Sequence, residues 1–283
     1  MTGKIEHVTD TAFWIASLRA LESERPDALF HDPLAAVLAG EKGRAIALSM
    51  HAFGLIAFTV TQRTTALDRL ILEAISNGVD TVLNLGAGLD TRPYRMALPG
   101  ALRWVEADFP SMIQFKNDKL AHERAVCELE RVALDLSLRA ERQALLKRVA
   151  ERSQGVLLLT EGVIPYLPDD EVGRLADDVR AEPQFRYWAQ EYYGIEARRH
   201  RGKVRKNLQA APFLFAAPDW FAFFERHGFV QHKTIPMREE ALRNGRRPPF
   251  LSPVRPLMWN LGPKFRHKAD RILGYTTLEP RRS

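Results

Sequence analysis

The chain has 283 residues, of which 46% are hydrophobic, 27% charged and 9% aromatic. This composition is ordinary for a globular protein, and the length is enough to bury one large core. Its single cysteine, Cys127, excludes a disulfide framework and a thiolate metal cluster within one chain, and we expect no metal site.

No segment of the sequence predicts a membrane span or a linker between domains. The longest apolar run, residues 52–58, is far shorter than the ~20 residues that a bilayer-spanning helix needs. The first residues lack the basic and apolar pattern of a targeting segment. We therefore expect one elaborated domain without membrane contact, in a reducing, cytoplasmic compartment.

The formal net charge of +6 raises the question of an anionic partner such as nucleic acid. The dense basic cluster is Arg198-Arg-His-Arg-Gly-Lys-Val-Arg-Lys206, and no aromatic platform of the RNA-binding type accompanies it. A solvated loop or helix face explains such a run more often than a binding site does. Nucleic acid is therefore not the expected partner.

Helices are predicted first along the chain. Apolar positions in residues 9–24 fit a helix that Pro26-Asp27 ends, and residues 31–36 predict a turn into a second helix. Residues 61–77 place an apolar stripe on one face of a third helix, which stops at Asn77-Gly78.

Short apolar strands then alternate with helices, an order that indicates βαβ units and a parallel sheet. The strands are expected at 79–85, 102–107, 130–134, 155–160 and 185–190, and the helices between them at 110–122, 138–152 and 169–181. A later helix at 218–226 and strands at 229–235 and 275–278 predict an antiparallel ending. Residues 236–270 resist assignment.

A glycine pair closes the first predicted strand, in Asn84-Leu-Gly86-Ala-Gly88. Glycine lets the backbone turn sharply there and leaves room for a ligand that approaches the main chain. The pair alone is a weak signal, because glycine after a strand also serves to pack the following helix.

The residues beyond the glycine pair separate two kinds of nucleotide ligand. A dinucleotide fingerprint would place its third glycine where Thr91 stands, and Asp90 beside it brings negative charge toward the place of a pyrophosphate. S-adenosylmethionine (SAM) has no phosphate and carries a sulfonium, an ammonium and a carboxylate. The loop therefore favours SAM over NAD or FAD. Thr91 and Pro93 also fit the start of a short helix, with Thr91 as its N-cap.

An acidic residue at the end of the second strand is expected to hold the ribose hydroxyls. Asp108 lies 22 positions beyond Gly86, and Glu106 is the reserve candidate on the same side of the strand. Either side chain could instead cap the segment that begins at Phe109-Pro110.

Seven segments in order resemble the leucine carboxyl methyltransferase family, including its bacterial branch of SAM-dependent methyltransferases that act on small molecules. They cover roughly the first 170 residues. The segments are Thr11-Ala-Phe-Trp-Ile-Ala-Ser-Leu-Arg-Ala20, Phe30-His-Asp-Pro-Leu34, Arg63-Thr-Thr-Ala-Leu-Asp68, Leu83-Asn-Leu-Gly-Ala-Gly-Leu-Asp-Thr-Arg92, Glu106-Ala-Asp-Phe-Pro110, Leu134-Asp-Leu136 and Thr160-Glu-Gly-Val-Ile-Pro-Tyr-Leu167.

The resemblance implies which residues bind the methionyl part and the ribose of SAM. Arg63 would pair with the SAM carboxylate through its planar guanidinium, although it could also be a surface charge on its helix. Gly86-Ala87-Gly88 would accept the methionyl portion, and Asp108 would hold the ribose.

The resemblance assigns further residues to the adenine, the methyl group and the acceptor. Asp135 would meet the adenine amino group and Leu136 would pack on the ring; Asp135 could instead be the N-cap of the following helix. Glu161 would lie near the ammonium and the transferred methyl. Arg19, on the N-terminal helix, resembles a cationic residue that reaches back over the cofactor. Tyr166, just beyond Glu161, would border the acceptor, although an aromatic residue there is as often a packing residue.

The resemblance also implies the architecture. It is a class I, Rossmann-like, doubly wound α/β fold with a mostly parallel seven-stranded sheet, an N-terminal helical extension and an inserted helical lid. We expect a helical cap at 1–60, a cofactor-binding core at 61–192, and an acceptor-side insertion with terminal strands at 193–283.

The expected reaction is in-line transfer of the SAM methyl group to an oxygen, which leaves S-adenosylhomocysteine (SAH). A carboxylic acid is favoured over a phenol, because an ionised carboxylate needs no general base and no His or Lys stands in a motif position that compels the phenol interpretation. The alternatives are a protein C-terminal carboxyl methyltransferase and an RNA-binding methyltransferase that uses 198–206.

Six aromatic residues in the C-terminal third are candidates for an apolar acceptor pocket, although such a stripe is more often core. They are Phe213, Phe215, Trp220, Phe221, Phe223 and Phe224. The oligomeric state cannot be inferred from the sequence.

Overall fold

The computed structural model describes residues 7, 9–49, 53–194, 212–249 and 272–281. The basic cluster 198–206 lies outside these residues. Within them the chain forms a seven-stranded sheet in the order β3-β2-β1-β4-β5-β7-β6. The strands are β1 Thr81–Leu85, β2 Arg103–Asp108, β3 Glu128–Ala133, β4 Val156–Leu159, β5 Phe185–Tyr193, β6 Phe229–Pro236 and β7 Leu273–Pro280.

The sheet is parallel from β3 to β5 and antiparallel at the β7–β6 edge, as the alternation in the sequence predicts. The strand β1 pairs with β2 on one side and with β4 on the other. The chain order therefore reverses at β1. Ligands of doubly wound sheets bind beyond the carboxyl ends of the strands at such a point.

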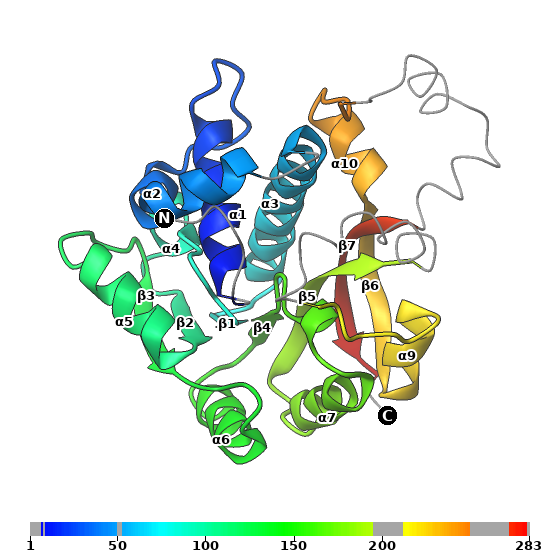
Figure 1. Cartoon of the computed structure of the whole chain (residues 1–283). Coiled ribbons are helices and arrows are strands. Elements are labelled where there is room, and N and C mark those ends of the chain that lie inside the picture. The colour runs from blue at the N-terminus through cyan, green and yellow to red at the C-terminus, as the bar shows by residue number, and fades with distance from the viewer. Residues whose placement is uncertain (1–6, 8, 50–52, 195–211, 250–271, 282–283) are drawn as a thin grey trace.

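Helices cover both faces of the sheet and extend over one end (Figure 1). The helices α6, α7 and α9 pack on one face and α3 on the other, because each presents an apolar stripe to the buried strands. The helices are α1 Asp10–Ser23, α2 Pro33–Ser49, α3 Phe53–Ser76, α4 Arg92–Arg95, α5 Pro110–Lys119, α6 Arg139–Ala150, α7 Asp169–Arg180, α9 Trp220–Arg226 and α10 Met237–Arg243, with a 3₁₀ turn at Ile164–Tyr166.

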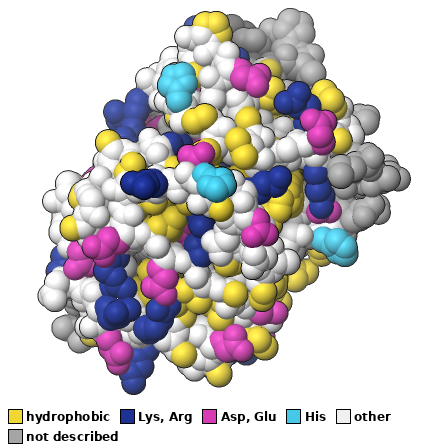
Figure 2. Space-filling view, turned by 90° about the vertical axis from the view of Figure 1, so that its left-hand side faces the viewer, with side chains coloured by type: hydrophobic (Ala, Val, Ile, Leu, Met, Phe, Trp, Pro, Cys, Tyr) yellow, Lys and Arg dark blue, Asp and Glu magenta, His cyan; other side chains and the backbone are white. Residues whose placement is uncertain are grey.

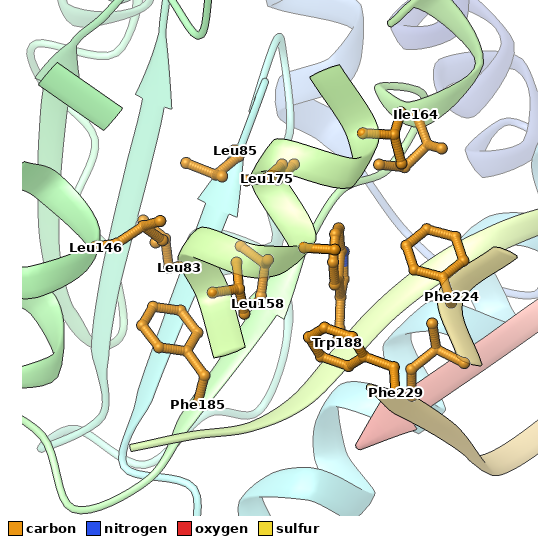
Figure 3. Packing of buried hydrophobic residues seen from close by; sticks show 14 of the residues in the cluster. Leu83, Leu85, Leu146, Leu158, Ile164, Leu175, Phe185, Trp188, Phe224 and Phe229 are labelled. Atoms are coloured by element: carbon orange, nitrogen blue, oxygen red, sulfur yellow. The ribbon is translucent and has the colours of Figure 1, made fainter. Parts of the chain in front are cut away.

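The larger core lies between the strands and α6, α7 and α9. Figure 3 shows Trp188 of β5 among aliphatic side chains from the strands and α7, with Phe224 and Phe229 beside it. The Trp188 ring meets Phe224 and Phe229 edge-on, and its Nε1 donates a hydrogen bond to Thr160 Oγ1 at 2.8 Å. This packing fixes the carboxyl ends of β4 and β5 relative to each other.

Several elements are longer than the sequence predicts, and two of them bear on the site. The helix α3 begins at Phe53 instead of residue 61, because Ile56 and Val60 pack against α1 and α2 in a separate cluster. The strand β5 continues to Tyr193, three residues beyond the predicted end, because β7 pairs with it over that stretch. The helix α10 forms inside the tract that resists assignment.

The N-terminal helices α1 and α2 lie beside α3 at one end of the molecule (Figure 1). Their apolar side chains form two small clusters, one with α3 and one with α5. Among the described helices, none has the length and hydropathy of a membrane span.

Candidate functional site

A cavity of about 480 Å³ lies at the carboxyl ends of β1, β4 and β5, under α1 and α3. Its walls divide by chemistry. One side, here called the cofactor half, holds the glycine loop, Arg63 and Glu161. The other side, the acceptor half, holds aromatic and aliphatic side chains: Trp14, Ile15, Ile56, Val60, Tyr166, Tyr193 and Phe213.

The glycine loop needs its glycines for two separate reasons. Gly86 and Gly88 have φ of 67° and 47°, which L side chains rarely adopt. A Cβ on Gly86 would also lie 2.5 Å from Val163 Cγ2. The Gly86 and Ala87 N–H groups both donate to Ala107 O, which fixes the turn. The loop is therefore a tight cradle in which the backbone itself faces the cavity.

Asp108 lies directly behind this loop, at the end of β2. Its carboxylate accepts hydrogen bonds from the Gly88 N–H at 2.6 Å and from the Phe109 N–H at 2.7 Å. Burial raises the pKa of Asp108, against these two donors. The reserve candidate Glu106 is fully buried in ion pairs with Lys116 and Arg131.

Glu161 links two arginines at the bottom of the cofactor half. Its carboxylate lies 2.7 Å from Arg63 Nε and 2.8 Å from Arg92 Nη2, and all three side chains are nearly buried. Burial alone would raise the pKa of Glu161, but Arg92 and Arg63 together lower it. Arg63 is therefore part of the cavity wall and not a surface charge.

Arg92 is the centre of this ionic cluster, and the sequence did not single it out. Its guanidinium contacts Asp68 at 2.6 Å, Asp90 at 2.7 Å and Glu161 at 2.8 Å. The pKa of Asp90 is lowered despite its burial, chiefly by the charge of Arg92. Asp90, whose negative charge argues against a pyrophosphate ligand, is thus an ionised member of the network.

Arg19 lines the cavity, but its guanidinium is committed to structural contacts. It pairs with Asp32 at 2.8 Å and donates to Leu89 O at 2.5 Å. The Thr91 hydroxyl donates to the same Asp32 carboxylate at 2.6 Å. Thr91 occupies the N-cap position of α4, as the sequence predicts, although its side chain makes no capping hydrogen bond. Arg19 ties α1 to the glycine loop.

Asp135 and Leu136 lie outside the cavity lining. The Asp135 carboxylate accepts hydrogen bonds from the N–H and hydroxyl of Ser137 at 2.9 and 2.8 Å. The alternative that Asp135 caps the following helix is wrong, because α6 begins at Arg139 with Leu138 in the cap position. Leu136 nevertheless lies close to the glycine loop, since its Cδ1 is 4.0 Å from the position that a Cβ on Gly86 would take.

One of the six aromatic residues proposed from the sequence lines the acceptor half. Phe213 lines the cavity, with its ring centroid 5.0 Å from that of Tyr166 and 6.4 Å from that of Tyr193. The others pack in or against the large core, so for them the core interpretation is confirmed: Phe215, Trp220, Phe221, Phe223 and Phe224.

Glu191 is a buried cavity residue that the sequence reasoning missed. It is 1% exposed, and its carboxylate oxygens lie 2.8 and 3.1 Å from the Gly162 nitrogen, whose N–H donates to them. Burial raises its pKa, against the charge of Arg63. The predicted strand stopped one residue short of it. An acidic residue directly after the predicted strand was the available signal.

Sequence comparison assigns the chain to a family. A model of the leucine carboxyl methyltransferase family matches residues 12–180, which is more than half of the chain. The chain belongs to the leucine carboxyl methyltransferase family. SAM is its cofactor, as the glycine loop predicts, and the resemblance seen in the sequence is confirmed.

Two relatives of this leucine carboxyl methyltransferase family member come from Streptomyces species. A predicted SAM-dependent methyltransferase of Streptomyces coelicolor is 36% identical over 192 residues, which cover 61% of this chain and 66% of that protein. One of Streptomyces avermitilis is 33% identical, over 64% of this chain and 69% of that protein. The matches thus span about two thirds of the relatives' length.

Two crystal structures share the fold over nearly the whole length. A DUF574 family protein from Streptomyces avermitilis has a TM-score of 0.57 at 14% identity and covers 94% of this chain and 96% of its own. A methyltransferase structure from Thermobifida fusca has a TM-score of 0.57 at 17% identity, with 95% of each chain covered. The predicted class I, Rossmann-like α/β fold is confirmed.

Proposed function

We propose that the chain is a SAM-dependent O-methyltransferase that acts on a small-molecule acceptor. The observation that carries the proposal is the Arg63–Glu161 pair beside the glycine loop. It places a guanidinium and a carboxylate 2.7 Å apart in a nearly buried wall. Opposite charges at this spacing complement the carboxylate and ammonium of an amino acid.

The residues of the cofactor half fit SAM in further respects. Gly86, Ala87 and Gly88 all line the cavity, so a bound group can approach the backbone of this loop closely. Arg63 would take the methionyl carboxylate, Glu161 the ammonium and Asp108 the ribose hydroxyls. Asp135 and Leu136 would bound the adenine, and Arg19 would hold α1 against the loop. SAM would supply an activated methyl group at the boundary of the two halves.

The acceptor half supports a small molecule. The whole cavity, at about 480 Å³, lies within the ~300–1,000 Å³ usual for small-molecule sites, and the aromatic walls of the acceptor half suit an apolar body. Tyr166 and Phe213 would position that body, and little acid chemistry is needed because the leaving sulfur departs neutral. A carboxylic acid remains the prediction of the sequence, and a protein C-terminal carboxyl group its alternative.

An RNA-binding methyltransferase is the weaker alternative. On the face shown in Figure 2, Lys and Arg side chains lie among Asp and Glu, so the positive charge there is interrupted. A nucleic-acid surface would carry an unbroken basic stripe. Filter binding of RNA and DNA at two ionic strengths tests this alternative, because such binding would weaken steeply with salt.

Titration calorimetry with SAM, SAH and NAD tests the main proposal. We expect SAM and SAH to bind and NAD not to bind. A screen of matched carboxylic acids and phenols, read by SAH release, then identifies the acceptor. No binding of SAM, or tighter binding of NAD than of SAM, would overturn the proposal.

A further inference from the structure

Glu191 stands where the two halves of the cavity meet. On one side its carboxylate accepts from the N–H of Gly162, the residue after Glu161. On the other side it lies two residues before Tyr193, so both side chains point to the same face of β5. Tyr193 in turn contacts Phe213 in the acceptor half. A donor methyl and an acceptor oxygen must meet at such a boundary.

The Glu191 carboxylate differs from the other carboxylates that line the cavity. Among the described residues, Asp90 contacts the guanidinium of Arg92, and Glu161 contacts those of Arg63 and Arg92. The Glu191 carboxylate instead accepts its hydrogen bonds from the Gly162 N–H. Glu191 therefore brings a carboxylate to the cavity wall that no hydrogen-bonded guanidinium among the described residues neutralises.

The net charge of SAM limits which acceptor can lie beside Glu191. Bound SAM carries one net positive charge, since its ammonium and carboxylate cancel and the sulfonium remains. That single charge can offset Glu191 or an ionised acceptor, but not both. A carboxylate acceptor would therefore bring a second negative charge next to the buried Glu191 carboxylate, which is costly, whereas a hydroxyl would add none.

We propose that Glu191 makes the acceptor half selective for a neutral hydroxyl group over an ionised carboxylate, and that it accepts the hydroxyl proton during transfer. The inference rests on the methyl transfer proposed above and departs from the sequence's preference for a carboxylic acid. That preference assumed that no base was available, and Glu191 supplies one.

The step balances without a further reactant. The acceptor oxygen bonds to the methyl carbon as the sulfur–carbon bond breaks and its electron pair returns to sulfur. The hydroxyl proton passes to a Glu191 carboxylate oxygen and from there to solvent. An ionised carboxylate acceptor would release no proton and would give Glu191 no such role.

The groups that face Glu191 set its basicity. They are Arg63 on α3, Glu161 after β4, Tyr193 on its own strand and Tyr275 on β7. Burial and Glu161 raise the pKa of Glu191, whereas Arg63 lowers it, and the net shift is upward from 4.5. A carboxylate with a raised pKa is a better proton acceptor near neutral pH.

Binding of matched ligands tests the selectivity. We would titrate 2-naphthol and 2-naphthoate, and phenol and benzoate, into the SAM-loaded protein at pH 7 by calorimetry. The hydroxyl member of each pair should bind at least ~10-fold more tightly. Glu191→Gln should remove most of this preference by tightening the carboxylate. Glu279→Gln, a strand glutamate outside the cavity, should leave it unchanged.

A preference of the wild type for the carboxylates, or an unchanged ratio in Glu191→Gln, would contradict the inference. Binding of neither member of any pair would contradict it equally. Failure of the wild type to bind SAM would instead remove the methyltransferase proposal, so the two failures are distinguishable.

A second measurement separates proton transfer from a structural role. Glutamine retains an oxygen that can accept from the Gly162 N–H, so Glu191→Gln should keep the Kd for SAM within about 2-fold. Its kcat for a hydroxyl acceptor should fall by ~10²–10⁴-fold, and the rise of kcat with pH should disappear. Equal losses in SAM binding and kcat would show that Glu191 only supports the turn.

Discussion

The two halves of the cavity are built in opposite ways. The cofactor half is ionic: Arg92 alone joins Asp68, Asp90 and Glu161 within 2.8 Å. The acceptor half is apolar, with aromatic contacts such as that between Tyr166 and Phe213, whose ring centroids lie 5.0 Å apart. The ionic half consists of short motifs that can be read in the sequence. The apolar half is assembled from side chains far apart along the chain.

This difference indicates which half depends on exact side-chain geometry. Buried ion pairs fix the direction of each partner, because an unpaired buried charge is very costly. Apolar contacts are less directional and tolerate changes of similar volume. We therefore expect the cofactor half to respond sharply to substitution, and the acceptor half to change in shape while SAM binding persists.

The largest effect is expected from Arg92→Met. It would leave three carboxylates without a shared partner, one of them Asp90, in a site where the arginine is 3% exposed. The free energy of unfolding should fall by ~3–5 kcal/mol, measured by urea denaturation. The exposed Arg174→Met on α7 is the control and should cause no measurable change. A loss of similar size in both variants would mean that the cluster is not special.

Gly86→Ala should come next and should act on the loop. The residue would be held at φ of 67° with its Cβ 2.5 Å from Val163 Cγ2. Positive φ costs an L residue ~1–2 kcal/mol, and the overlap adds to this. SAM affinity should fall at least ~10-fold by calorimetry. Gly245→Ala is the matched control, since its φ is 63° with nothing within 4 Å. Unaltered SAM binding in Gly86→Ala would show that the cradle is not the cofactor site.

Asp108→Ala should weaken SAM binding by ~1–3 kcal/mol, if a charged hydrogen-bonded pair is lost. The variant also removes the acceptor for the Gly88 N–H, so part of the effect passes through the loop. Asp118→Ala, on the exposed face of α5, should bind SAM as the wild type does. Equal affinity of both variants would remove Asp108 from the site.

The smallest effect concerns acid stability and contrasts the halves directly. The pKa values of Glu161 and Asp90 are lowered in the folded chain from 4.5 and 3.8, so their contribution is present above those values and is lost as pH falls. The pKa of Glu191 is raised above its ordinary 4.5, so ionising this carboxyl group in the folded chain destabilises the fold as pH rises above about 4.5.

Urea denaturation between pH 3 and 7 measures both effects. The free energy of unfolding should fall as pH drops below about 4.5, where carboxyl groups ordinarily titrate. Glu191→Gln should gain stability at the upper end, and an identical pH dependence in both proteins would contradict its raised pKa.

The sequence alone determined the sheet and most of the cofactor half. Strand and helix periodicity, the Gly86-Ala-Gly88 turn and the acid at Asp108 are local patterns, because a parallel strand and its following loop are encoded by neighbouring residues. Arg63 and Glu161 were found through ordered motifs. Thr91 is the N-cap of α4 as predicted, but nothing in the sequence indicated that its hydroxyl donates to Asp32, 59 residues away.

Tertiary structure alone decided the remainder. The extension of β5 to Glu191 depends on pairing with β7, and the start of α3 depends on packing against α1 and α2. Neither contact leaves a pattern in neighbouring residues. The same holds for Arg92, whose three carboxylate partners come from three different segments. Charges and apolar surfaces that meet only after folding are set by the whole chain, and the nature of the acceptor depends on them.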